Sequence, residues 1–199
     1  NKVTGMAVVQ GGLVSVGWDD KIRFSSTDDA TAAYHTDLEL NGQPIALASC
    51  VATTDLLLVV TTAEVALFRG TSKLAALTVA ELGFAPTCGA LFNESQVAIG
   101  GADFKTHIYA LSGESFTPVT TIETRSAVSA LAYSPSGDSL AIGDDGRQVE
   151  LYDTATWEAR VKGRWVFHTS KITTLAWSPE GRYLASGSLD ENIYLWSPA

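Results

Sequence analysis

Short apolar runs separated by tight turns fill the C-terminal part of the chain. One apolar run ends at residues 175–177 and another covers residues 183–186, with the turn Ser-Pro-Glu-Gly at 178–181 between them. Proline at the second turn position and glycine at the fourth favour a type I hairpin. A third run, residues 192–196, alternates as a half-buried strand does. The pattern predicts three antiparallel strands joined by short turns.

The same arrangement recurs upstream at a nearly constant period. Residues 127–153 repeat it clearly, and Ser134 of their Ser-Pro-Ser-Gly turn precedes the matching Ser178 by 44 residues. Three weaker copies come before them. The copies end at equivalent positions, namely Ser25, Phe68, Tyr109, Tyr152 and Trp196. Their spacings are 43, 41, 43 and 44 residues, which is the length of a four-stranded propeller blade. We expect five repeats, at about 1–29, 30–72, 73–113, 114–156 and 157–199.

The last copy resembles a WD repeat over residues 168–199. Four residue types stand at the spacings of that family's hydrogen-bonded tetrad: His168, Ser186 or Ser188, Asp190 and Trp196. The resemblance implies that these side chains tie the outer and inner strands of the blade together. Either serine satisfies the spacing, so both stay candidates.

The repeats predict an all-β fold, a β-propeller segment of five four-stranded antiparallel blades with almost no helix. We expect Leu131, Ala132, Leu175 and Ala176 to be buried around the axis. The sequence shows no outer strand after Trp196 and no strand that would close the ring. We therefore expect the segment to be part of a larger propeller, with the remaining blades of that propeller as its neighbours; the family resemblance given below implies seven blades.

Composition and charge limit the classes of partner. The chain has 199 residues, 46% of them hydrophobic, and a formal net charge of −9. A substantial core is therefore possible, and the acidic balance argues against nucleic acid and anionic membrane as partners. The sequence contains no secretory signal and no apolar stretch long enough to span a bilayer. We expect a cytoplasmic protein.

No pattern of residues indicates catalysis. The three histidines lie far apart and lack the spacing of metal ligands, and the chain has no nucleophile elbow or phosphate-binding loop. The acidic pairs Asp19-Asp20, Asp28-Asp29 and Asp144-Asp145 fall at blade turns, where such side chains bond to nearby backbone amides. We predict no catalytic residue, no metal site and no cofactor.

Exposed side chains at the blade turns are the candidates for partner binding. Trp18 precedes the turn residue Asp19, and Phe104 follows the turn residue Asp103. In WD propellers these turns lie on the surface where partners dock, and an exposed tryptophan is a typical hot-spot residue. The alternative is that Trp18 folds back onto its own blade. Lys2 and Lys171, at the starts of two inner strands, are weaker candidates.

The order of weak and strong copies resembles the actin-interacting protein 1 family, whose members assist cofilin. The segments that carry this resemblance are residues 12–26, 96–109 and, above all, 171–196. It implies two fused seven-bladed propellers, with this chain in the second, and a scaffold that promotes cofilin-mediated actin filament disassembly at the actin cytoskeleton. Actin filaments and cofilin would be its partners. The alternative is another WD-repeat scaffold, such as a substrate receptor of a ubiquitin ligase.

Overall fold

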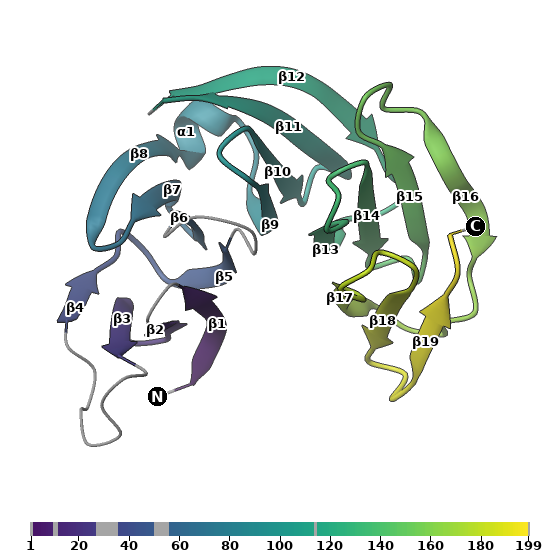
Figure 1. Cartoon of the computed structure of the whole chain (residues 1–199), viewed down its shortest axis with the longest axis horizontal. Coiled ribbons are helices and arrows are strands. Elements are labelled where there is room, and N and C mark those ends of the chain that lie inside the picture. The colour runs from purple at the N-terminus through teal and green to yellow at the C-terminus, as the bar shows by residue number, and fades with distance from the viewer. Residues whose placement is uncertain (1, 10–11, 27–35, 50–55, 114, 199) are drawn as a thin grey trace.

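Five antiparallel sheets stand side by side around an open arc (Figure 1). The computed structural model describes residues 2–9, 12–26, 36–49, 56–113 and 115–198. The first strands of successive sheets line the inside of the arc, and the fourth strands lie at its outer rim. The described strands β1 and β19 belong to the two ends of the arc and do not pair with each other. The predicted all-β blade architecture is confirmed.

Each sheet is built from strands that are consecutive in the sequence. The first contains β1 (Val3–Val9), β2 (Gly12–Gly17), β3 (Lys21–Ser26) and β4 (Thr36–Glu39). The second contains β5 (Pro44–Ser49), β6 (Leu56–Thr61), β7 (Glu64–Arg69) and β8 (Ser72–Thr78). The third contains β9 (Pro86–Phe92), β10 (Gln96–Gly101), β11 (Lys105–Ser112) and β12 (Ser115–Glu123).

The last two sheets differ in their number of strands. The fourth contains β13 (Val128–Tyr133), β14 (Ser139–Asp144), β15 (Val149–Asp153) and β16 (Ala159–Trp165). The fifth contains only β17 (Ile172–Trp177), β18 (Leu184–Ser188) and β19 (Ile193–Trp196). Four sheets therefore have the predicted four strands, and the last lacks the outer strand that the sequence analysis also found missing after Trp196. The division into five sequence repeats stays a prediction.

The single helix among the described residues is one short turn, α1 (Val79–Leu82), after the second sheet. Thr78 precedes it and forms a capping box with Glu81: the Glu81 amide donates to the Thr78 hydroxyl, and the Thr78 amide donates to the Glu81 carboxylate. Gly83 ends the helix with φ of 75°, a left-handed conformation that suits glycine. The helix therefore serves as a connection between blades.

The core lies between neighbouring sheets. Four clusters of buried apolar side chains each join two successive sheets. The second strands are the most deeply covered, and every residue of β6 and of β14 is buried. Packing against both faces of a strand explains why these strands are nearly continuous apolar runs instead of alternating ones.

Side-chain hydroxyls also join successive inner strands. Thr87 on β9 donates to the carbonyl of Val128 on β13 at 2.5 Å, and Ser129 on β13 donates to the carbonyl of Ile172 on β17 at 2.6 Å. Thr173 occupies the same place on β17, but it donates within its own sheet, to Gly187 at 3.2 Å. These bonds fix the first strand of one blade against the first strand of the next.

The residues expected around the axis are less covered than predicted. Leu131, Ala132 and Leu175 are half-buried, and Ala176 is exposed. The inner strands form the inside edge of the arc, so side chains that do not face a neighbouring sheet border its open centre. The prediction selected the apolar run correctly but not the residues that meet a second sheet.

Candidate protein-binding site on the top face

One set of turns forms a continuous face of the arc, which we call the top face. It consists of the turns between the second and third strands of each sheet and the connections that lead into each first strand. In every sheet the first residue of the turn donates its backbone N–H to the carbonyl of the residue at, or just before, the start of the inner strand. The five bonds, of 2.9–3.0 Å, are Trp18 to Lys2, Thr62 to Gln43, Ala102 to Ala85, Asp145 to Ala127 and Leu189 to Lys171.

The structure brings Trp18 and Lys2 together on this face. Their backbones share the recurring hydrogen bond, and the Lys2 ammonium lies 4.9 Å from the centre of the Trp18 ring. The indole remains 55% exposed, which argues against the alternative that it folds back into its own blade. A cation over an aromatic ring is attracted by the ring's negative face. The pair therefore presents an apolar surface and a positive charge side by side.

Phe104 lies two blades away from Trp18 on the same face. It is 52% exposed and has a φ of 65°, in the left-handed region. The third turn residue is left-handed in three other blades as well: Asp20, Arg147 and Glu191. A bulky side chain rarely adopts this conformation, because its Cβ crowds the backbone. Phe104 therefore combines exposure with a strained backbone.

Lys171 is engaged by the neighbouring blade. Its ammonium lies 2.9 Å from Oδ1 of Asp145, which begins the turn of the fourth sheet. Both side chains remain more than 40% exposed, so the pair is screened by solvent and contributes little to stability. The candidates thus form separate groups: Lys2 with Trp18, Phe104 by itself, and Lys171 with Asp145.

The tetrad residues of the last blade meet in one buried chain, and the serine is Ser186. The Trp196 indole N–H donates to the Ser186 hydroxyl at 2.8 Å, and that hydroxyl lies 2.7 Å from Nε2 of His168. Nδ1 of His168 lies 2.9 Å from the Asp190 carboxylate. Ser188 is outside the chain and donates to the carbonyl of Ser170 at 2.9 Å.

The Asp190 carboxylate is held in its charged form. Burial raises the pKa of this group, but backbone N–H donors from Thr169 and Asn192, together with His168, outweigh that effect and lower the pKa well below its ordinary value. Ring contacts enclose the same cluster: Tyr194 lies edge-on to His168 at 4.6 Å, and Trp165 of the fourth sheet stacks on Trp196 at 5.1 Å. The tetrad is a structural element that also joins the last two blades.

Two weaker blades contain a pair that the sequence analysis missed. In the first blade Arg23 donates to the Asp19 carboxylate. In the third, His107 Nε2 lies 3.0 Å from Asp103 and its ring stacks on Phe84 at 3.7 Å. Asp19 and Asp103 occupy the turn position that Asp190 has in the last blade. The signal in the sequence was an aspartate followed four residues later by a basic residue. In these two blades the basic residue lies on the third strand, whereas His168 of the last blade lies in the loop between blades.

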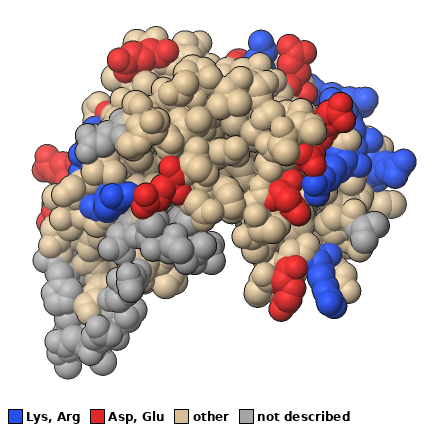
Figure 2. Space-filling view, turned by 45° about the horizontal axis from the view of Figure 1, so that its top comes forward, with Lys and Arg blue, Asp and Glu red and all other residues tan. Residues whose placement is uncertain are grey.

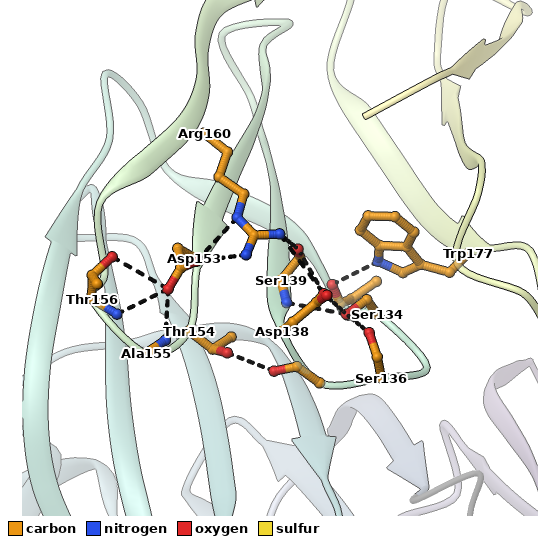
Figure 3. A network of polar contacts seen from close by, with 12 residues as sticks. Ser134, Ser136, Asp138, Ser139, Asp153, Thr154, Ala155, Thr156, Arg160 and Trp177 are labelled. Carbon is orange, nitrogen blue, oxygen red and sulfur yellow. Dashed lines mark hydrogen bonds and ion pairs between the residues drawn. The ribbon is translucent and has the colours of Figure 1, made fainter. Parts of the chain in front are cut away.

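A polar network closes the base of the fourth blade on the opposite face (Figure 3). Asp138 accepts hydrogen bonds from the hydroxyls of Ser134 and Ser139, both at 2.9 Å, and Arg160 donates to Ser139 at 2.7 Å. Arg160 also donates to Asp153 at 2.5 Å, which is the main reason that the pKa of Asp153 falls to about 2. These bonds are turn chemistry that fixes two hairpins.

An apolar pocket of about 390 Å³ adjoins this network. Its lining residues, none of them charged, are Leu91, Phe92, Asn93, Ala132, Tyr133, Ser134, Pro135, Leu175, Ala176, Trp177 and Pro179. The Trp177 indole at its wall donates to the Ala132 carbonyl at 3.1 Å. The volume is within the usual range of ligand pockets, but the walls offer shape and apolar surface without a titratable group in a catalytic arrangement.

Metal and membrane features can be stated only for the described parts of the chain. Those residues contain no group of three or more His, Cys, Asp or Glu side chains placed to hold a metal ion. Within the same ranges no helix has the length and apolar character needed to cross a membrane. The pair Asp28-Asp29, which the sequence analysis assigned to a turn, lies outside the described residues.

Charge is unevenly distributed around the arc. Figure 2 shows most of the visible surface without charge, and its largest gathering of Lys and Arg side chains lies on the side that holds the last two blades in Figure 1. Seven of the thirteen basic residues fall between Arg125 and Arg182. A chain with a net charge of −9 therefore has one comparatively basic side.

Known proteins resemble this chain in both sequence and fold. Residues 116–153 and 161–197 match the family described as WD domain, G-beta repeat. A solved structure, the Cps50 (Swd1) β-propeller domain of Myceliophteria thermophila, has a similar fold. The structural match covers 98% of this chain and 64% of that one, with a TM-score of 0.83 and 16% identity. At that identity the likeness shows the fold alone, which is a β-propeller.

Relatives with higher identity cover nearly all of the chain. The 66 kDa stress protein of Physarum polycephalum is 35% identical, over 96% of this chain and 31% of its own length. Actin-interacting protein 1 is 32% identical in Caenorhabditis elegans and 31% in Drosophila melanogaster, over 98% and 100% of this chain. The chain spans about a third of the length of these relatives. It is therefore a β-propeller segment that contains two WD-repeat matches and is similar, over nearly its whole length, to proteins named actin-interacting protein 1.

Proposed function

We propose that this chain is part of a non-enzymatic scaffold that binds actin filaments and promotes their disassembly by cofilin. Support comes from the relatives that bear the name actin-interacting protein 1 and match nearly the whole chain. The fold adds a continuous face of turns, of the kind on which propellers bind proteins. No observation favours a ubiquitin-ligase receptor over this function. Such a protein would act at the cytoplasmic actin cytoskeleton.

The observation that supports binding through this segment is the exposed pair of Trp18 and Lys2. Trp18 is 55% exposed although its backbone is fixed by the recurring turn hydrogen bond. A preordered aromatic ring loses little conformational entropy on binding, and tryptophan is among the residues most enriched at binding hot spots. The cation of Lys2, beside the ring, adds a group that can pair with an acidic side chain.

The test is co-sedimentation of the full-length protein with actin filaments, with and without cofilin. Trp18→Ala is expected to cost about 2 kcal/mol of binding, or about 30-fold in Kd, and to leave the melting temperature nearly unchanged. Tyr183→Ala is the matched control, because Tyr183 is an aromatic residue, 46% exposed, that follows a turn on the opposite face.

Three results would count against the proposal in different ways. If the wild-type protein does not sediment with filaments in either condition, the actin function is wrong. If Trp18→Ala lowers stability but binds normally, Trp18 is a packing residue. If both variants bind normally with normal stability, the contact lies elsewhere on the protein.

A further inference from the structure

Three exposed residues stand on loops that contact one another at the top of the third and fourth blades. The amide and the hydroxyl of Thr124 both donate to the carbonyl of Phe104 at 2.9 Å. Two residues further along the same connection, the Ser126 hydroxyl accepts from the amide of Gly146 at 2.6 Å. Phe104, Arg125 and Arg147 therefore stand on loops that these hydrogen bonds join.

Both guanidinium groups of this set are available to a partner. Among the described residues the ion pairs of arginine involve Arg23, Arg69 and Arg160. Arg125 and Arg147 form no ion pair with any residue that the structure describes, and both side chains are exposed. Arg164 and Arg182 likewise form no ion pair with a described residue, so what distinguishes Arg125 and Arg147 is that they stand on hydrogen-bonded loops shared with the exposed Phe104.

The backbone beneath two of these residues is strained. Phe104 has a φ of 65° and Arg147 a φ of 74°, values at which glycine is the residue without steric cost. Packing does not account for phenylalanine at this position, because 52% of it is exposed. Because the same turn position is left-handed in three other blades, which carry Asp20, Arg147 and Glu191, what is particular to this turn is the exposed aromatic side chain of Phe104.

We propose that Phe104, Arg125 and Arg147 form a docking patch for an acidic segment of a protein partner. An arginine fork pairs with a carboxylate through two parallel hydrogen bonds, and the Phe104 ring offers an apolar anchor between such contacts. Aromatic and arginine side chains are the types enriched at protein interfaces. The segment that fits has Asp or Glu side chains next to an apolar one.

A protein segment fits the patch better than a lipid surface does. The turns that present Phe104 and Arg147 also contain Asp103 and Asp145, which are exposed carboxylates. A dense polyanion such as an anionic bilayer would be repelled by them, whereas a peptide can place its carboxylates at the two arginines alone. The patch deepens the proposed function, since it would supply a second contact on the same top face.

The experiment uses the full-length protein and matched charge reversals. The patch variant is Arg125→Glu with Arg147→Glu, and the control is Arg164→Glu with Arg182→Glu, which changes the net charge equally at exposed arginines outside the patch. The first probe is actin filaments decorated with cofilin. We expect the patch variant to bind about 10-fold or more weakly and with a flatter salt dependence, and the control to stay within about 2-fold of wild type.

Phe104→Gly separates binding from folding. It removes the ring and relieves the left-handed strain, so we expect weaker filament binding without a fall in melting temperature. Wild-type binding that is unchanged in the patch variant, or reduced equally in the control, overturns the patch. If the wild-type protein binds no filaments, the actin function has failed and the patch is tested separately.

That second test measures the anisotropy of a fluorescent peptide in which Glu alternates with Leu. Loss of peptide binding in the patch variant but not in the control supports the patch without reference to actin. Equal binding by both variants overturns it. Vesicles containing phosphatidylserine provide the third probe, and patch-dependent binding to vesicles without patch-dependent binding to the peptide would show that the occupant is a membrane and refute the proposal.

Discussion

The tetrad of the last blade makes the sharpest stability prediction, because the sequence allowed two serines and the structure uses one. In Ser186→Ala, the Trp196 indole N–H loses its acceptor at 2.8 Å and Nε2 of His168 loses its partner at 2.7 Å. Ser186 is fully buried, and His168 and Trp196 are 2% and 6% exposed. Water therefore has little access to the Trp196 indole N–H or to Nε2 of His168 once their partner is removed.

The expected cost follows from that burial. A buried polar group without a partner costs about 1–3 kcal/mol, so two of them cost about 2–6 kcal/mol if neither finds a replacement. Ser188→Ala is the control. That hydroxyl is half-buried and serves the Ser170 carbonyl and the Asp190 amide, and its loss is expected to cost about 0.5–1.5 kcal/mol.

Thermal unfolding, followed by the fluorescence of the tryptophans, is the assay. For a domain of this size each kcal/mol lowers the melting temperature by about 2–4 °C. We expect Ser186→Ala to lower it by at least twice as much as Ser188→Ala. A fall that is equal in both variants, or larger in Ser188→Ala, would refute the argument that the buried chain stabilises this blade.

Three further predictions concern other parts of the fold. Ser129→Ala removes an inter-blade hydrogen bond and is expected to cost about 1 kcal/mol in urea unfolding, whereas Thr173→Ala, at the same place without such a bond, should cost less; equal costs would contradict the inter-blade role. Phe104→Gly relieves a left-handed φ and should raise the melting temperature by a few degrees, about 1 kcal/mol, and a clear decrease would show that the ring packs. The low pKa of Asp153, about 2 beside Arg160, means that its stabilisation is complete above about pH 4 and is lost as the pH falls towards 2; Asp153→Asn should therefore flatten the acid side of a stability–pH curve, and an unchanged curve would contradict this.

The local features of this protein could be read from its sequence. Three of the positions aligned as repeat ends pair at matching places in their sheets: Trp196 with Leu184, Tyr152 with Leu140 and Tyr109 with Val97. Strand alternation and the chemistry of a Ser-Pro-x-Gly turn depend on residues that are neighbours in sequence, so the period of the repeat and the fold class followed from them.

The tertiary structure decided what depends on residues far apart in the chain. It selected Ser186 over Ser188, because only the Ser186 hydroxyl reaches His168, which is eighteen residues away in the sequence. It left Ala176 exposed, because coverage of an inner strand requires a neighbouring sheet on that side.

The candidate site divides in the same way. The sequence marked Trp18 and Phe104 as residues beside turns, but it left open whether Trp18 is exposed or folds back onto its own blade. The sequence did not show that Arg125 and Arg147 lie on loops in contact. The hydrogen bond between Ser126 and Gly146 joins residues twenty positions apart. It forms only when the turn between β14 and β15 packs against the connection that leads into β13. The conformation of a turn depends on residues that are neighbours in the sequence, whereas a surface patch consists of loops that only the packing of the sheets brings side by side.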